Sequence, residues 1–119
     1  PPVFAIYVSM LTLRWLKANG GIEWIEERNK IKAQLLYKTI DESPYFKGSA
    51  KLEDRSKMNV TFLLTEERLK SKFDQQCLDA GLNGLKGHRS VGGYRASMYN
   101  ALPLKSVQVL VNIINNIEK

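Results

Sequence analysis

The sequence predicts an α+β fold in which a small antiparallel sheet of about three strands is covered by helices. Long segments with helical spacing of apolar residues open and close the chain, and shorter segments with strand-like alternation lie between them. In chain order the predicted elements are α-α-β-α-β-β-α, so strands and helices do not alternate as they do around a parallel sheet. With 119 residues, 44% of them hydrophobic, the chain suits one compact domain without internal repeats.

Two helices are predicted before the first strand. Apolar residues recur near the i, i+3, i+4, i+7 spacing over residues 3–18, and the proline before them suits a first helical turn. The glycines at 20–21 predict the end of this helix. A second helix is expected over about 22–42, ending at Ser43 because the residue before a proline avoids the helical conformation. The side chains expected to face inward from it are Ile25, Ile31, Leu35, Leu36 and Ile40.

The middle of the chain predicts a strand followed by a helix. Residues 56–64, SKMNVTFLL, largely alternate apolar and polar side chains, which is typical of a strand with one buried face. The face expected to be buried carries Met58, Val60, Phe62 and Leu64. Thr65 is expected to cap the next helix, and Glu66 and Glu67 suit the positive end of its dipole. Gly81 is expected to end this helix.

The last third of the chain predicts two short strands and a helix. Residues 82–88 and 94–99 are expected to be strands on either side of a glycine-rich segment. The final helix, over about 104–118, has the most regular apolar stripe of the chain. That stripe consists of Val107, Leu110, Val111, Ile114 and Ile117.

Net charge alone does not identify a partner. The chain has 18 lysines and arginines against 12 acidic residues, a formal charge of +6, and its basic residues are spread from Arg14 to Lys119. Such a distribution is typical of solvated helix faces, and no zinc-binding spacing or RNA-binding aromatic motif accompanies it. We therefore expect no nucleic-acid partner.

The apolar segments and the cysteine content favour a cytoplasmic protein. The longest apolar stretch, residues 3–13, is shorter than the about 20 residues that a membrane-spanning helix needs, and it lacks the features of a signal peptide. The single cysteine, Cys77, excludes an internal disulfide and fits a reducing compartment. Because Cys77 follows Phe73 at helical spacing, we expect it to be a small core residue.

The segment GHRSVGGYRAS, residues 87–97, has the composition of an anion-binding site. It contains the only histidine, His88, together with Arg89 and Arg95 and three glycines. A guanidinium matches a carboxylate or phosphate with two parallel hydrogen bonds, and glycine lets a backbone approach a ligand closely. The segment matches neither a phosphate-binding P-loop nor a dinucleotide fingerprint. From the residues alone, an anion site and an ordinary turn with solvated charges remain equally open.

A wider stretch around this segment resembles a known family. Residues 85–104, LKGHRSVGGYRASMYNALPL, are similar to the C-terminal signature of phosphoserine aminotransferases. Residues 1–22 resemble the helix that opens the C-terminal domain of that family, and residues 54–64, DRSKMNVTFLL, resemble the first strand there. The resemblance therefore covers nearly the whole chain in order.

The resemblance implies a fold-type I transaminase that depends on pyridoxal 5'-phosphate and works as a homodimer. Its reaction transfers the amino group of L-glutamate to 3-phosphohydroxypyruvate. By position, Arg95 matches the arginine that holds the α-carboxylate of the substrate. His88 and Arg89 match residues that line the pocket for the distal phosphate or γ-carboxylate. Tyr94 departs from the methionine or aliphatic residue that the family usually has, and its alternation with Arg95 predicts that it points away from the ligand.

The same resemblance implies that residues 1–119 are a C-terminal small domain. The family's cofactor lysine and most of its phosphate ligands belong to a preceding large domain, and Lys86 lies in the wrong part of the pattern to be that lysine. We therefore expect this chain to be part of a longer enzyme, and on its own to be inactive and not to bind the cofactor. Two alternatives stay open: a stand-alone basic module for phosphate-bearing ligands or nucleic acid, and a sister enzyme of the same fold.

Overall fold

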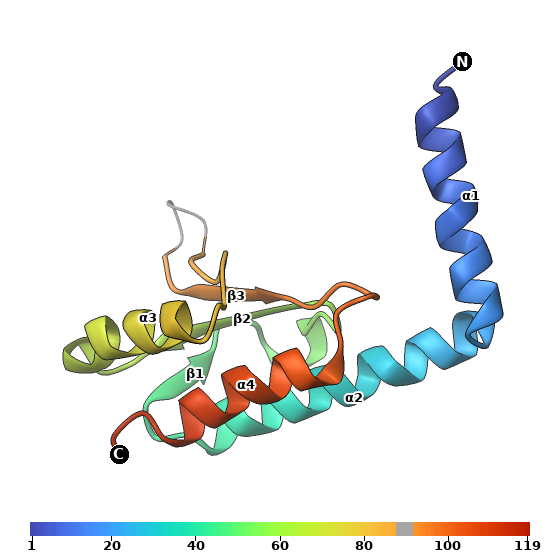
Figure 1. Cartoon of the computed structure of the whole chain (residues 1–119). Helices are drawn as coiled ribbons and strands as arrows, with labels where there is room; N and C mark the ends of the chain where they lie inside the picture. Colours follow the sequence, from blue (N-terminus) through green and yellow to red (C-terminus); the bar gives the residue numbers. More distant parts are fainter. Residues whose placement is uncertain (88–91) are drawn as a thin grey trace.

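The computed structural model describes residues 1–87 and 92–119 and has helices packed on one face of a small sheet (Figure 1). The helices are α1 (Val3–Ala18), α2 (Gly21–Glu42), α3 (Lys70–Asp79) and α4 (Leu104–Asn115), and the strands are β1 (Phe46–Gly48), β2 (Asn59–Leu64) and β3 (Tyr94–Ser97). Short 3-10 turns lie at Leu52–Asp54 and Glu67–Leu69. The expected α+β class with an antiparallel sheet is confirmed.

The sheet has the order β1-β2-β3, and both pairs of neighbouring strands are antiparallel. Phe46 lies opposite Leu64 in the first pair, and Thr61 lies opposite Arg95 in the second. One face of the sheet packs on the helices, and α2 and α4 run side by side beneath it (Figure 1). The described structure places no helix over the opposite face.

An aromatic cluster occupies the middle of the core. Phe73 of α3 packs against Phe46, Phe62 and Tyr94 from the three strands, and the ring centroids within this cluster lie 4.9–6.4 Å apart. The predicted inner faces are correct here, because Val60 and Phe62 are fully buried. The predicted stripe of the last helix is buried as well, at Val107, Leu110, Val111, Ile114 and Ile117.

The strands differ from the prediction in two places. β1 was not predicted, because a strand of three residues is too short to show an alternating pattern and depends on pairing with β2. The predicted strand at 82–88 is not formed in its described part. Residues 82–87 make only an isolated bridge, between Lys86 and Tyr94, after Gly81 and Gly84 turn the chain with φ values of +74°.

The predicted cap at Thr65 is also wrong. The Thr65 N–H donates instead to the Tyr45 carbonyl at 2.9 Å and so extends the pairing of β1 with β2. The helix begins only at Lys70, after the 3-10 turn. On α2, Ile31 was expected to face inward but is exposed, and the neighbouring Lys32 is buried in the core layer.

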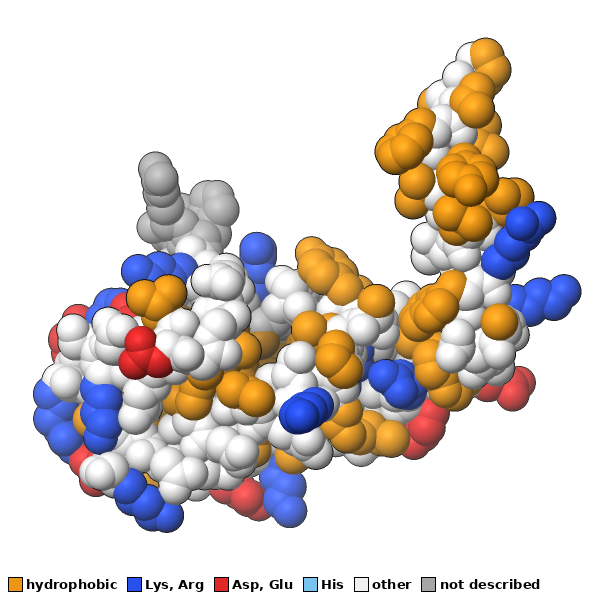
Figure 2. Space-filling model, viewed as in Figure 1, with side chains coloured by type: hydrophobic (Ala, Val, Ile, Leu, Met, Phe, Trp, Pro, Cys, Tyr) orange, Lys and Arg blue, Asp and Glu red, His pale blue; other side chains and the backbone are white. Residues whose placement is uncertain are grey.

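Helix α1 contributes nothing to the core. None of its residues is buried, and it projects away from the rest of the structure (Figure 1). It contacts α2 near the connecting turn, where the Trp15 and Trp24 rings meet edge to face with centroids 5.7 Å apart. Figure 2 shows hydrophobic side chains gathered along its length. Among the helices of the described residues, none has the length and apolar content to cross a membrane.

Candidate functional site

Arg95 lies on the face of the sheet that the helices leave uncovered. Along β3, Tyr94 and Ala96 point into the core with 6% and 5% exposure, so Arg95 and Ser97 project from the opposite face. Tyr94 and Arg95 therefore have opposite orientations, as expected. The backbone of Arg95 is held on both sides, because it is paired with Thr61 on β2 and its N–H donates to the Leu85 carbonyl at 2.7 Å.

The surroundings of Arg95 suit an acidic ligand. The residues on its face of the sheet, which we call the open sheet face, are Lys47, Asn59, Thr61, Leu63, Arg95 and Ser97. They include hydroxyl and amide groups and a second cation. Within residues 1–87 and 92–119, no carboxylate lies within ion-pair distance of Arg95. A guanidinium in this position offers its paired N–H groups to an external carboxylate or phosphate.

Gly87 and Gly93 lie close together, on either side of the residues outside the described structure. The Gly87 N–H donates to the Gly93 carbonyl at 2.9 Å, and a Cβ on Gly87 would lie 2.3 Å from the Gly92 carbonyl oxygen. Gly93 has φ +66°, and a Cβ there would lie 2.8 Å from the Phe62 carbonyl oxygen. Close approach of two backbones therefore accounts for these glycines without a ligand. His88 and Arg89, the other predicted site residues, lie outside the described residues.

Behind Arg95, a hydrogen-bonded cluster joins β3 to α3. The Tyr94 hydroxyl donates to Asp74 Oδ1 at 2.7 Å, and Lys70 Nζ donates to Asp74 Oδ2 at 3.0 Å. Burial, followed by the bond to Asp74, raises the pKa of Tyr94, so its hydroxyl stays protonated. Burial alone would raise the pKa of Asp74, but the hydrogen bonds from Tyr94 and Lys70 outweigh it and leave that pKa below its usual value. The cluster is a structural support for the strand that carries Arg95.

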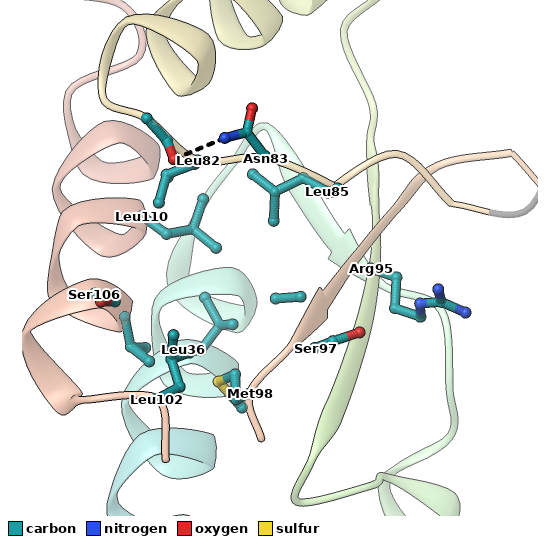
Figure 3. Close-up of a pocket in the computed structure, with 14 residues that line it drawn as sticks. Leu36, Leu82, Asn83, Leu85, Arg95, Ser97, Met98, Leu102, Ser106 and Leu110 are labelled. Carbon is teal, nitrogen blue, oxygen red and sulfur yellow. Dashed lines mark hydrogen bonds between the residues drawn. The ribbon is translucent and has the colours of Figure 1, made fainter. Parts of the chain in front are cut away.

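A cavity of about 370 Å³ lies on the other side of β3 (Figure 3). It is lined mainly by apolar side chains, among them Leu36, Leu82, Leu85, Met98, Leu102 and Leu110. Arg95 borders this cavity, but Figure 3 shows its guanidinium directed away from the leucines. The cavity is therefore no candidate for binding the acidic group that Arg95 suits.

Neither Cys77 nor a metal cluster supplies chemistry in the described residues. Cys77 is buried, and burial followed by the nearby Asp74 raises its pKa to about 11, so the thiol stays protonated at neutral pH. It is a core residue, as expected. In the described part of the chain, no group of three or more histidine, cysteine and acidic side chains is arranged to hold a metal ion.

The family of the chain follows from a comparison of the sequence with known families. The family model described as aminotransferase class-V matches residues 1–110. The chain belongs to this family. The relatives of the chain do not favour a stand-alone basic module or a sister enzyme of the same fold, the two alternatives from the sequence.

Relatives of this class-V aminotransferase chain share one name. Phosphoserine aminotransferases of Flavobacterium johnsoniae and Flavobacterium psychrophilum are 59% and 61% identical to it, each over 99% of this chain. The Bacillus subtilis phosphoserine aminotransferase is 50% identical over 100% of this chain. The chain spans about a third of the length of these relatives, 33% in each of the three.

Solved structures agree with the sequence relatives. A phosphoserine aminotransferase from Bacillus circulans subsp. alkalophilus, 42% identical, superimposes with a TM-score of 0.91 over 98% of this chain and 33% of its own. A PLP-bound phosphoserine aminotransferase from Trichomonas vaginalis, 38% identical, has a TM-score of 0.87 over 98% of this chain and 34% of its own. The fold of the described residues is therefore that of one part of such enzymes.

The described residues do not by themselves fit pyridoxal 5'-phosphate, which needs a lysine placed to bond it. Among the described residues, the only buried lysine is Lys32, and its ammonium is directed at three backbone carbonyls on the helical side of the sheet. On the open sheet face, Lys47 is an exposed residue of the edge strand β1. The burial of Lys32 was not predicted from the sequence. Its signal was a lysine that shares the inward face of α2 with Ile25 and Leu36.

Proposed function

We propose that this chain is the C-terminal, substrate-binding domain of a phosphoserine aminotransferase. The reaction transfers the amino group of L-glutamate to 3-phosphohydroxypyruvate and yields O-phospho-L-serine and 2-oxoglutarate. The observation that carries the proposal is the identity of 59–61% to curated phosphoserine aminotransferases over 99% of this chain. The position of Arg95 on an uncovered sheet face supports it, because both substrates present an α-carboxylate that a guanidinium can bind.

In this proposal different site residues bind the two ends of the substrate. Arg95 binds the α-carboxylate, which glutamate and phosphohydroxypyruvate have in common. His88 and Arg89 bind the distal group, which is a carboxylate in one substrate and a phosphate in the other. This division suits the chemistry, because one fixed guanidinium serves the shared group while an imidazole and a second guanidinium accept either distal anion.

The cofactor, pyridoxal 5'-phosphate, belongs in this proposal to a large domain that precedes these residues. When bound, it supplies the electron sink for amino-group transfer, and this chain supplies the groups that bind and orient the substrate. Two surfaces support a further domain: no helix of the described residues covers the open sheet face, and α1 has no buried residue. We further infer a homodimer in the cytoplasm, a reducing compartment that suits a chain with one buried thiol.

A chimeric enzyme tests this function directly. This chain replaces the matching third of the Flavobacterium johnsoniae phosphoserine aminotransferase, and turnover of glutamate with 3-phosphohydroxypyruvate is measured. We expect an active chimera, and we expect the 119-residue chain alone to show no turnover with added pyridoxal 5'-phosphate. A folded chimera that binds the cofactor but does not transaminate would refute the function. Turnover by the chain alone would refute the division into domains.

Two substitutions in the chimera test the roles of the arginines. Arg95→Ala removes a bidentate bond to the shared carboxylate, so kcat/KM for both substrates should fall about 100-fold. Arg89→Ala should chiefly remove the preference for 3-phosphohydroxypyruvate over hydroxypyruvate, which lacks the phosphate. Arg68→Ala, at an exposed arginine paired with Glu118, is the control and should change neither quantity. Identical profiles for Arg95→Ala and Arg89→Ala would contradict the division of roles.

A further inference from the structure

Lys32 is a charged side chain buried among the apolar side chains on the inward face of α2. It lies in the middle of α2 with 1% of its surface exposed. Its ammonium donates to three backbone carbonyls, those of Tyr99 at 2.9 Å, Leu102 at 3.2 Å and Met98 at 3.4 Å. Within the described parts of the chain, no acidic side chain forms an ion pair with it.

The number of acceptors matches the chemistry of a charged amine. An ammonium has three N–H donors, and each of them reaches a carbonyl here. A neutral amine has only two N–H groups and would leave one of these carbonyls without its donor. Burial, followed by the charge of Arg28 one turn earlier, lowers the pKa of Lys32. The hydrogen bonds to the three carbonyls offset this cost of burying the charged ammonium.

The three carbonyls belong to one turn, residues 98–102, which joins β3 to α4. The turn is closed by the Leu102 N–H, which donates to the Tyr99 carbonyl at 2.9 Å. Beside Lys32, the Asn29 amide donates to the Asn100 side chain at 2.8 Å, so a second residue of α2 holds the same turn. The bonds from Lys32 therefore connect α2 to the junction between the sheet and α4.

This junction is the end of the strand that carries Arg95. Met98 directly follows β3, and its N–H donates to the Met58 carbonyl at 2.7 Å while its carbonyl accepts from Lys32. β3 pairs with β2 along its length but has only the isolated bridge at Lys86 on its other side. The position of its last residues is therefore set by β2 on one side and by the turn that Lys32 holds at its end.

We propose that Lys32 is a positioning residue whose buried ammonium, bound by the carbonyls of Met98, Tyr99 and Leu102, fixes the end of β3 and thereby the place of the Arg95 guanidinium. The effect on substrates rests on the proposed function. The effect on the fold does not, because it follows from the contacts of Lys32 alone.

The first test measures substrate kinetics in the chimeric enzyme. Lys32→Met keeps most of the side-chain volume and removes the charge and all three donors. It should lower kcat/KM about tenfold or more for both substrates through KM, because a displaced Arg95 binds their shared carboxylate less well. The control is Lys30→Met, since Lys30 is a half-exposed lysine of the same helix with an ion pair to Glu26. A KM within twofold of the parent in a folded Lys32→Met chimera would overturn the proposal.

The second test determines whether the ammonium group itself stabilises the fold, and it does not depend on enzymatic activity. Lys32→Ala leaves a space that 1-propylammonium can fill with the missing carbons and three N–H donors, whereas 1-propanol has similar size and one donor. Propylammonium should raise the Tm of Lys32→Ala and leave the parent unchanged, and propanol should not discriminate between them. Equal effects of the two compounds on Lys32→Ala would overturn the proposal. An inactive but folded parent chimera would instead refute the proposed function, and the Tm comparison would still decide the role of Lys32.

Discussion

At the residue scale, neighbouring positions of β3 serve different parts of the molecule. Arg95 projects from the open sheet face, while Tyr94 packs its ring against Phe62 and Phe73 and donates its hydroxyl to Asp74. Alternation along a strand separates the two roles, so the tyrosine can support the strand without reaching the side on which Arg95 projects. We therefore expect the departure from the family's usual aliphatic residue to change packing and stability, with little change in substrate preference.

Removal of the Tyr94 hydroxyl should destabilise the fold in a pH-dependent way. Tyr94→Phe keeps the ring packing and removes a hydrogen bond to a carboxylate, which lowers the free energy of unfolding by about 1–2 kcal/mol at pH 7. The pKa of Asp74 is lowered in the folded state, so its bonds stabilise the protein above the unfolded pKa, about 3.9, and lose this effect as the pH falls through the folded value. The difference between parent and variant should therefore shrink as the pH falls below about 3.9 and through the folded pKa of Asp74.

Urea denaturation of the chimera at several pH values measures this difference. Tyr99→Phe is the control, because Tyr99 is an exposed tyrosine whose hydroxyl has no partner among the described residues. A Tyr94→Phe protein as stable as the parent at pH 7 would contradict the structural role of the hydrogen bond.

At the element scale, the segment between β1 and β2 is fastened to α2 by Arg55. Its guanidinium forms two bonds to Asp41, of 2.6 and 2.7 Å, and lies 4.5 Å above the centre of the Tyr37 ring. The Tyr37 hydroxyl donates to the Ser56 carbonyl at 2.9 Å. Gly48 leaves room for this arginine, because a Cβ there would lie 2.9 Å from Arg55 Nη2. These contacts attach the segment after β1 to the helix beneath it.

Replacement of Arg55 by lysine should weaken the attachment of this segment to α2. Lysine keeps the charge but loses the paired geometry and the flat contact with Tyr37, so we expect a loss of about 1 kcal/mol in the free energy of unfolding. A double-mutant cycle of Asp41→Asn with Arg55→Met, which removes the charge at both positions, isolates the contribution of the ion pair when measured by urea denaturation at pH 7. We expect a coupling of about 0.5–1 kcal/mol. Strictly additive effects of the two substitutions would show that the pair contributes nothing.

Elements with long periodic patterns could be predicted from the sequence, and elements defined by tertiary contacts could not. The helices α1, α2 and α4 and the strand β2 show repeated spacing, and all four elements are present in the structure. The inner faces of α2, α4 and β2 are largely as predicted, whereas α1 has no buried residue. β1 becomes a strand only through its pairing with β2. Thr65 resembles a cap locally, but its N–H extends the pairing of β1 with β2 and the helix begins only at Lys70.

In the candidate site, too, features that depend on a local pattern could be predicted and features that depend on long-range contacts could not. The orientation of Arg95 could be predicted from simple alternation along its strand. The burial of Lys32 could not, because nothing local to α2 shows that three carbonyls from residues 98–102 converge on it. Long-range polar contacts of this kind leave only a weak local signal, a charged residue on an apolar helix face.

At the scale of the whole molecule, α1 has a largely exposed apolar surface. Val3, Phe4, Ile6 and Leu13 are 59–79% exposed, and Figure 2 shows the hydrophobic side chains gathered on this helix. Contiguous apolar patches on a protein surface mark interaction sites or promote association. In the proposed enzyme this surface packs against the cofactor-binding domain, so the 119-residue chain studied by itself should associate through it.

Sedimentation velocity of the 119-residue chain over a range of concentrations measures this association. The parent should exceed its monomer mass of 13.6 kDa as the concentration rises, and Phe4→Glu/Leu13→Glu should remain near that mass, because two carboxylates interrupt the apolar surface. Leu52→Glu/Leu78→Glu is the matched control. It adds the same charge at two exposed leucines away from α1, and it should associate like the parent. Circular dichroism checks that all three proteins retain their helices. A parent that stays monomeric throughout, or a control that dissociates as fully as the α1 variant, would show that α1 does not drive the association.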